Sequence, residues 1–139
     1  MKKGFTLLEL IIVMIIVGVL AFLAIGQYGN IAEKARGAEA KGLLGDLKTQ
    51  SAIIAYEDGA GAVDATNLSL GASGIPAACR ATHWFRYGAT GNDAANRAIL
   101  TATRCTASGK DPQYVGVGTI TLDVNFTSGN STETIVGPW

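Results

Sequence analysis

The sequence lacks the residues on which most catalytic and metal sites depend. Among 139 residues it has one histidine, His83, and two cysteines, Cys79 and Cys105. A histidine-based triad or a site with several histidines is therefore excluded, and no C-x-x-C pair or Cys/His cluster predicts a metal site. No other catalytic constellation stands out. We therefore predict a protein that is not an enzyme and that needs no cofactor.

Net charge is also absent, because Lys plus Arg and Asp plus Glu number 11 each. A neutral chain is not steered toward nucleic acid or anionic lipid, so no nucleic-acid partner is predicted. Beyond residue 25 the chain is rich in Gly, Ala and Thr and has few bulky apolar residues. We expect one small domain with a modest core.

The N-terminus reads MKKGFTLLELIIVMIIVGVLAFLAI, and its apolar run over residues 5–25 carries a single charge, Glu9. The run is long enough to span a bilayer as a helix, and Lys2 and Lys3 would hold the N-terminus in the cytoplasm. An ionised side chain at the middle of a membrane costs at least ~2.5 kcal/mol. Glu9 therefore needs a compensating partner.

Two ordinary interpretations of this run remain open. A secretory signal peptide would have Lys2 and Lys3 as its basic region and Ala24-Ile25-Gly26 as its small-residue cleavage site. However, Glu9 falls where the uncharged region should begin, and the run continues without a break into another helical pattern. A plain transmembrane anchor fits the length but leaves Glu9 unexplained.

The segment KGFTLLELIIV resembles the processing and assembly signature of type IV pilins and of type II secretion pseudopilins. The resemblance is specific over residues 2–25 and general in layout to about residue 57. It implies that residues 1–4 form a leader containing Lys2 and Lys3. It further implies that a prepilin peptidase cleaves after Gly4 and N-methylates the new first residue, Phe5.

The resemblance assigns Glu9 to assembly. Cleavage would make a cationic amine on Phe5, and this amine could offset the Glu9 carboxylate. Within one chain, positions 5 and 9 would lie one helical turn apart on the same face. Between chains, Glu9 of a subunit in the membrane could attract the Phe5 amine of the subunit already at the filament base.

A structural subunit of an extracellular type IV pilus is therefore our prediction. Its implied partners are identical subunits, the prepilin peptidase, the inner-membrane assembly platform and the membrane that holds it before assembly. A pseudopilin of a type II secretion system is the alternative within the superfamily. A single-span, membrane-anchored binding module is the alternative from another class.

Residues 27–57 contain no proline and have helical spacing of apolar residues. We expect Ile31, Ala35, Ala38, Leu43, Leu47 and Ile54 to form the apolar stripe. Arg36 and Glu39 are expected to form a weak pair. A continuous helix over 5–57 would be ~80 Å long, with a filament-core half at 5–28 and an amphipathic half at 29–57. Glycines predict a weak stretch between Gly18 and Gly29.

The turn sequence Asp58-Gly59-Ala60-Gly61 ends the helix pattern. Residues 58–139 should form the globular head, with a loop over 60–80 in which a short helix at 67–70 is possible. Strands are expected at 83–87, 98–104, 118–126 and 133–136, the third from its period-two alternation. The predicted class is α+β: a long helix packed on an antiparallel sheet of about four strands, as in the pilin fold.

An exported chain meets an oxidising compartment, where Cys79 and Cys105 are expected to bond; two buried thiols are the alternative. In many pilins the disulfide encloses a loop near the C-terminus, whereas this pair would tie the post-helix loop to the second strand. Asn125 heads one of three glycosylation sequons, a motif that also arises by chance. The aromatic run at 83–87 is interpreted as core and interface packing.

Overall fold

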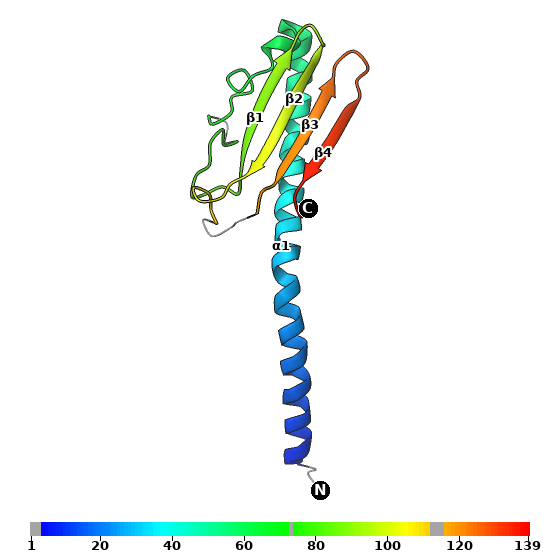
Figure 1. The fold of residues 1–139 in the computed structure, drawn as a ribbon, viewed down its shortest axis with the longest axis vertical. Coiled ribbons are helices and arrows are strands. Elements are labelled where there is room, and N and C mark those ends of the chain that lie inside the picture. The colour runs from blue at the N-terminus through cyan, green and yellow to red at the C-terminus, as the bar shows by residue number, and fades with distance from the viewer. Residues whose placement is uncertain (1–3, 73, 112–115) are drawn as a thin grey trace.

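The computed structural model describes residues 4–72, 74–111 and 116–139 (Figure 1). A long helix, α1 (Leu7–Asp58), leads to a short 3-10 turn, η1 (Ala60–Ala62). Four strands follow: β1 (Phe85–Asn92), β2 (Arg97–Arg104), β3 (Thr119–Asn125) and β4 (Ser131–Val136). They pair antiparallel in the order β1-β2-β3-β4. The predicted α+β, pilin-like class is confirmed.

Helix α1 has 52 residues, which makes it ~78 Å long at the rise of an α-helix. The predicted start at residue 5 is wrong by two residues. Thr6 has extended backbone angles, φ −79° and ψ 150°, and acts as the N-cap. At the other end Gly59 adopts φ +91°, which favours glycine and ends the helix. The helix is unbroken between Gly18 and Gly29, and weakness there in a filament stays a prediction.

The two halves of α1 differ in their contacts. Every residue from 7 to 31 is exposed, and this half projects from the head as an arm (Figure 1). From residue 33 onward one face is buried against the sheet, at positions three or four apart. This face consists of Glu33, Gly37, Ala40, Leu44, Leu47 and Ser51.

The predicted apolar stripe was therefore only partly correct. Leu47 is fully buried, and Leu43 and Ile54 are half-buried. Ile31, Ala35 and Ala38 are exposed. The face that meets the sheet combines Leu44 and Leu47 with small residues and with a carboxylate, Glu33, that has partners in the head. A count of apolar positions does not detect the small residues or the carboxylate.

The sheet differs from expectation mainly in β1. The first strand was expected to end at residue 87, but Gly88 to Asn92 continue it and pair with Thr101 to Arg97. The connection to β2 is therefore a short turn at residues 93–96. At Gly91 a Cβ atom would overlap the carbonyl oxygen of Ala60, so glycine lets η1 pack closely there. The other three strands lie within two residues of their predicted bounds.

The core lies between the buried face of α1 and the inner face of the sheet. Its largest members are Leu44 and Leu47 from the helix, Phe85, Tyr87, Leu100 and Ile120 from the sheet, and Val63 and Leu68 from the segment after the helix. The possible short helix at 67–70 is not formed. That stretch makes turns instead, held by bonds such as Leu70 N–H to the Ala65 carbonyl at 2.8 Å.

Trp139 closes the lower end of this core. Its ring meets Phe85 edge-on, with centroids 5.3 Å apart. The Trp139 side chain lies against Gly37 of α1, where any side chain would overlap it. Small residues on the helix are therefore what allows the C-terminal segment to approach.

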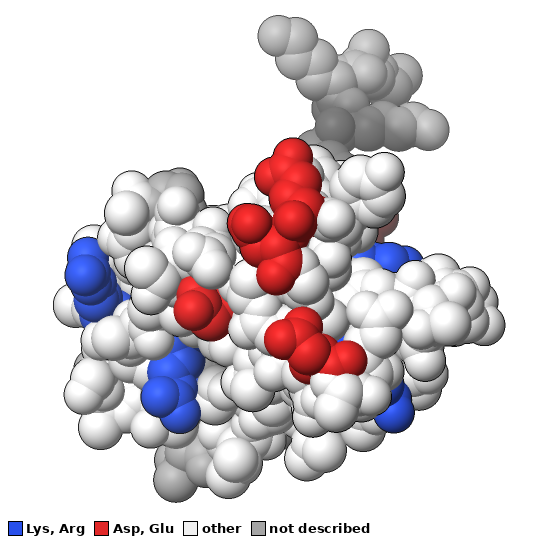
Figure 2. Space-filling model, turned by 90° about the horizontal axis from the view of Figure 1, so that it is seen from above, with Lys and Arg blue, Asp and Glu red and all other residues white. Residues whose placement is uncertain are grey.

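Figure 2 views the end of the head furthest from the N-terminus. Acidic side chains gather near the middle of this face, and basic side chains lie apart from one another toward its sides. Nucleic-acid binding depends on basic groups that neutralise several phosphates at once. This face offers no such surface.

Candidate functional site

The segment before α1 holds the predicted processing residues. Lys2 and Lys3 lie outside the described residues. Gly4 and Phe5 are exposed and precede the helix, and Phe5 is 88% exposed. The peptide bond between them is therefore accessible and free of helical hydrogen bonds, as a protease requires.

Glu9 contacts Thr6 through a capping box. The Thr6 hydroxyl oxygen accepts a hydrogen bond from the Glu9 N–H at 3.3 Å. In return the Glu9 carboxylate accepts bonds from the Thr6 N–H and hydroxyl, each at 3.0 Å. This reciprocal arrangement satisfies donors that would otherwise be orphaned at the helix start. The capping role of Thr6 was not predicted, although T-x-x-E before an apolar run is a known capping signature.

The expected geometry of Phe5 and Glu9 is corrected by this cap. Phe5 is not on the helix, so it does not lie one turn below Glu9 on the same face. In the uncleaved chain, the Phe5 nitrogen is also part of a peptide bond and carries no charge. The Glu9 carboxylate is hydrogen-bonded by Thr6, but its charge has no cationic partner among the described residues.

The arm is apolar all round. Its bulky side chains from Leu7 to Ile31 are each about half exposed or more. By length and composition α1 is the one helix in the described parts of the chain that could cross a membrane. Over residues 7–25, where Glu9 is the one charged residue, the apolar surface is ~28 Å long at 1.5 Å per residue. Such a surface is unstable in water and marks a membrane or protein contact.

A buried ion pair joins α1 to the head where the arm ends. The Arg104 guanidinium donates two bonds to Glu33, at 3.1 and 3.0 Å, and its side chain is fully buried. It also donates to the carbonyls of Trp84 and Cys105 at 3.1 and 3.0 Å. Arg36 pairs with Glu33 and stacks over Trp84, 3.7 Å from the ring centroid. We call Glu33, Arg36, Trp84 and Arg104 the junction cluster.

The junction cluster is electrostatically coupled. Burial by itself raises the pKa of the Glu33 carboxyl, but hydrogen bonds and attraction from Arg104 and Arg36 outweigh it and hold the pKa below its ordinary value. The expected Arg36–Glu39 pair is wrong, because Arg36 turns to Glu33 instead. The role of Arg104 as the partner of Glu33 was not predicted, because a strand pattern does not show which distant helix residue a side chain will contact.

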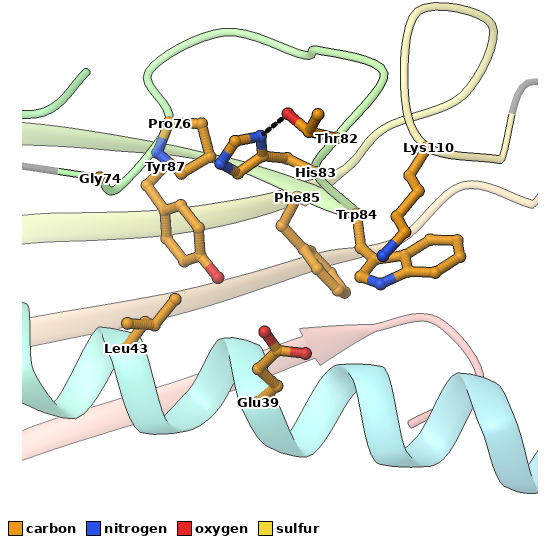
Figure 3. A pocket seen from close by; sticks show the side chains of 10 residues that line it. All are labelled: Glu39, Leu43, Gly74, Pro76, Thr82, His83, Trp84, Phe85, Tyr87 and Lys110. Carbon is orange, nitrogen blue, oxygen red and sulfur yellow. Dashed lines mark hydrogen bonds between the residues drawn. The ribbon is translucent and has the colours of Figure 1, made fainter. Parts of the chain in front are cut away.

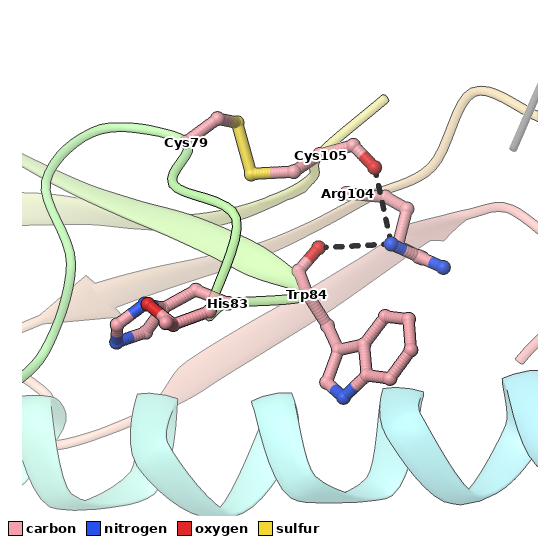
Figure 4. Close-up of a disulfide and its surroundings, with 6 residues drawn as sticks. Cys79, His83, Trp84, Arg104 and Cys105 are labelled. Atoms are coloured by element: carbon pink, nitrogen blue, oxygen red, sulfur yellow. Dashed lines mark hydrogen bonds between the residues drawn. A yellow bond between two sulfur atoms is a disulfide. The ribbon is translucent and has the colours of Figure 1, made fainter. Parts of the chain in front are cut away.

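The disulfide lies directly beside this cluster. Cys79 and Cys105 are bonded, with Cα atoms 5.5 Å apart (Figure 4). Cys105 follows Arg104 at the end of β2, and its N–H donates to the Trp84 carbonyl at 2.8 Å. The bond therefore ties the loop before β1 to the strand that holds the helix.

A pocket of about 390 Å³ opens between α1 and the start of β1. Figure 3 shows the Tyr87 hydroxyl pointing toward α1 between Leu43 and Glu39. Burial, with a smaller contribution from Glu39, raises the pKa of Tyr87. Lys110 sits 4.9 Å from the centroid of Trp84, and the His83 ring bonds to the Thr82 hydroxyl at 2.7 Å. The described residues contain no group of three metal-ligating side chains.

Asn125 ends β3, and its side chain caps the following turn. Its amide oxygen accepts bonds from the N–H groups of Thr127 and Ser128 at 2.9 and 3.0 Å. Glycosylation of this half-buried amide stays a prediction.

Comparison with known proteins finds one sequence motif and one similar protein. Residues 1–25 match the prokaryotic N-terminal methylation motif. Fimbrial protein EcpC of Eikenella corrodens is 37% identical over 70 residues, which cover 50% of this chain and 44% of EcpC. These findings confirm the resemblance to type IV pilins. The pilin-like chain thus spans less than half the length of this relative, and no solved structure matches it.

Proposed function

We propose that this chain is the structural subunit of an extracellular type IV pilus. It enters the inner membrane as a prepilin, is cleaved after Gly4, is methylated on Phe5, and polymerises through its N-terminal helix. The observation that carries the proposal is the arm of α1, which is exposed throughout. From Leu7 to Ile25 it is apolar on every side and carries one carboxylate, Glu9.

The domain roles follow from this arm. Residues 1–4 are the leader read by the prepilin peptidase, and Lys2 and Lys3 keep it on the cytoplasmic side. Residues 5–28 lie in lipid before assembly and against identical helices afterwards. Residues 29–57 carry the head, residues 58–139. The inner-membrane assembly platform moves the subunit from one environment to the other.

Glu9 has two roles in this scheme, and cleavage switches between them. In the prepilin its carboxylate completes the capping box with Thr6. Cleavage turns the Phe5 nitrogen into a cation, which gives Glu9 a charged partner in the growing filament. A buried charge without a partner is destabilising by ~3–5 kcal/mol. The pair therefore sets the axial register of each new subunit.

The decisive test separates capping from charge. Glu9→Gln keeps a capping-box acceptor but removes the charge, whereas Thr6→Ala removes the cap and keeps the charge. We expect Glu9→Gln and Glu9→Leu to be cleaved normally and to form no filaments, and Thr6→Ala to form them. Cleavage is measured by mass spectrometry of the N-terminus, and filaments by electron microscopy of sheared cell surfaces.

The same measurements separate the alternatives. A methylated Phe5 start with long surface filaments supports the pilus. A methylated start with only short periplasmic assemblies indicates a pseudopilin. An intact Met1 rules out both and leaves the anchored binding module. A start at Gln27 rules out all three, because it removes the apolar run and indicates a cleaved signal peptide. Normal filaments from Glu9→Gln would refute the role of charge in assembly.

A further inference from the structure

A second concavity lies on the face of the sheet that is turned away from α1. Along β1 and β2, buried and less buried residues alternate, and Arg86, Gly88 and Thr90 occupy the outer face of β1. Ile99, Thr101 and Thr103 occupy the same face of β2. Because the arm of α1 forms the filament core in the proposed function, this outer face is the one left toward the exterior.

The segment after the helix forms a wall of this concavity. It runs along the outer edge of β1, where Asp64 bridges Thr90 and the Tyr87 N–H donates to the Pro76 carbonyl at 2.8 Å. Ala65 and Ala77 from this segment line the groove, whose volume is about 330 Å³. The edge of β1 is therefore already occupied there, and an added peptide strand would find few free backbone groups.

The floor of the groove is glycine, and its sides carry hydroxyls. Gly88 lies opposite Thr101, whose hydroxyl is 3.4 Å from the Gly88 carbonyl. A Cβ atom at Gly88 would approach the Thr101 hydroxyl to 3.0 Å. Thr90 and Thr103 line the same groove. The site thus presents several hydroxyls that can both donate and accept hydrogen bonds, next to a strand position that carries no side chain.

One uncompensated cation stands at the groove. Arg86 is exposed and lines it, and none of the ion pairs in the described ranges includes Arg86. Arg97, on the outer face of β2, is neutralised by Asp123. A free guanidinium recognises a carboxylate through two parallel hydrogen bonds.

We propose that this groove binds a uronate residue of an acidic polysaccharide. Arg86 pairs with the sugar carboxylate, the hydroxyls of Thr90, Thr101 and Thr103 bond the sugar hydroxyls, and the Gly88 floor admits the ring. The groove combines threonine hydroxyls with one exposed apolar side chain, Ile99. This combination suits the hydroxyls and the apolar face of a sugar ring better than an acidic peptide, whose backbone would find few free groups on β1. The proposal rests on the proposed function for its outward orientation, and repetition along a filament would multiply weak single-site affinity.

The experiment measures binding of the full chain to immobilised polygalacturonate. Filaments are used where cells form them, and the chain in detergent micelles is used in parallel, so that failed assembly is not mistaken for failed binding. We expect Arg86→Ala to weaken binding about tenfold, the loss typical of one charge-assisted contact pair. Arg97→Ala is the matched control, because it also removes one outer-face cation and should change binding less than twofold.

Competition by soluble polymers identifies the chemical class of ligand that the groove binds. Neutral dextran and polyglutamate should compete poorly, and Gly88→Ala, which fills the floor, should weaken binding without changing the melting temperature by more than a few degrees. Four results would overturn the proposal: no binding in micelles or filaments; equal losses from Arg86→Ala and Arg97→Ala; dextran sulfate competing as well as free polygalacturonate, which indicates charge alone; or polyglutamate competing better, which indicates a protein partner.

Discussion

The arm and the head half of α1 share one continuous helix but are stabilised by different means. Residues 7–31 are all exposed, whereas from residue 33 onward one face of α1 is buried against the sheet. In the arm, helix formation depends on local factors: the capping box and the side chains' own preferences. In the head, it depends on tertiary contacts. The same kind of substitution should therefore have different consequences in the two regions.

The residues chosen in each half reflect this difference. The arm carries bulky apolar side chains on every face, since its partners are lipid or other copies of the chain. The buried face in the head uses Gly37 and Ala40, which let Trp139 and the sheet approach closely. The more apolar half of α1 is thus the half that stays exposed in the single chain. Four predictions separate local from tertiary stabilisation.

Removing the disulfide should have the largest effect on the head. The bond closes a loop with a sequence separation of 26, so Cys79→Ser with Cys105→Ser should lower the free energy of unfolding by about 3.5 kcal/mol in the chain-entropy model. The measurement is denaturant unfolding of the full chain in detergent, followed by near-ultraviolet circular dichroism. The far-ultraviolet signal from the helical arm should persist after the head unfolds. Simultaneous loss of the near- and far-ultraviolet signals would contradict the idea that arm and head are stabilised independently.

Breaking the junction cluster should come next. Arg104→Ala leaves Glu33 with only Arg36 as a charged neighbour and should cost about 3 kcal/mol, the lower end for a buried pair that loses one partner. Replacing both Glu33 and Arg104 by Met removes the stranded charge and should recover part of the loss. Chemical unfolding of the three proteins provides the measurement. Equal losses in the single and double variants would show that packing, and not charge, holds the junction.

A pair of glycine substitutions compares the two halves directly. Gly37→Ala must displace Trp139 and should destabilise the head by about 1–3 kcal/mol. Gly29→Ala meets nothing within 4 Å and should favour the helix by up to ~1 kcal/mol. Thermal unfolding in detergent tests both. If the two substitutions shift the melting temperature in the same direction, the contrast between the halves fails.

The pH dependence should be the smallest effect. The pKa of Glu33 is lower in the folded chain than its ordinary value of about 4.3. The contribution of Glu33 to the free energy of unfolding is therefore complete above its ordinary pKa. This contribution is lost as the pH falls through the folded-state pKa. Subtracting the profile of Glu33→Gln from that of the natural chain isolates this group from the other carboxylates. A difference that does not change between pH 6 and pH 3 would contradict the assignment.

The sequence was a good guide wherever a pattern is local. Alternation along 118–126 predicted β3 within one residue at each end, and the turn at Asp58 to Gly61 correctly ended the helix. It was a poor guide for β1, where Gly88 and Gly91 are typical of turns. Pairing with β2 and the approach of η1 outweigh that local preference. Capping by Thr6 was readable and overlooked, whereas the partner of Glu33 was not readable at all.

The sequence alone determined the apolar arm, its single carboxylate and the signature around Gly4 and Phe5, because these depend on residue type and spacing within a few turns. Only the tertiary structure decided which face of α1 meets the sheet, where Arg104 finds Glu33, and which arginine of the outer face stays unpaired. Those outcomes depend on side chains far apart in the chain, and local spacing carries no information about distances that folding creates.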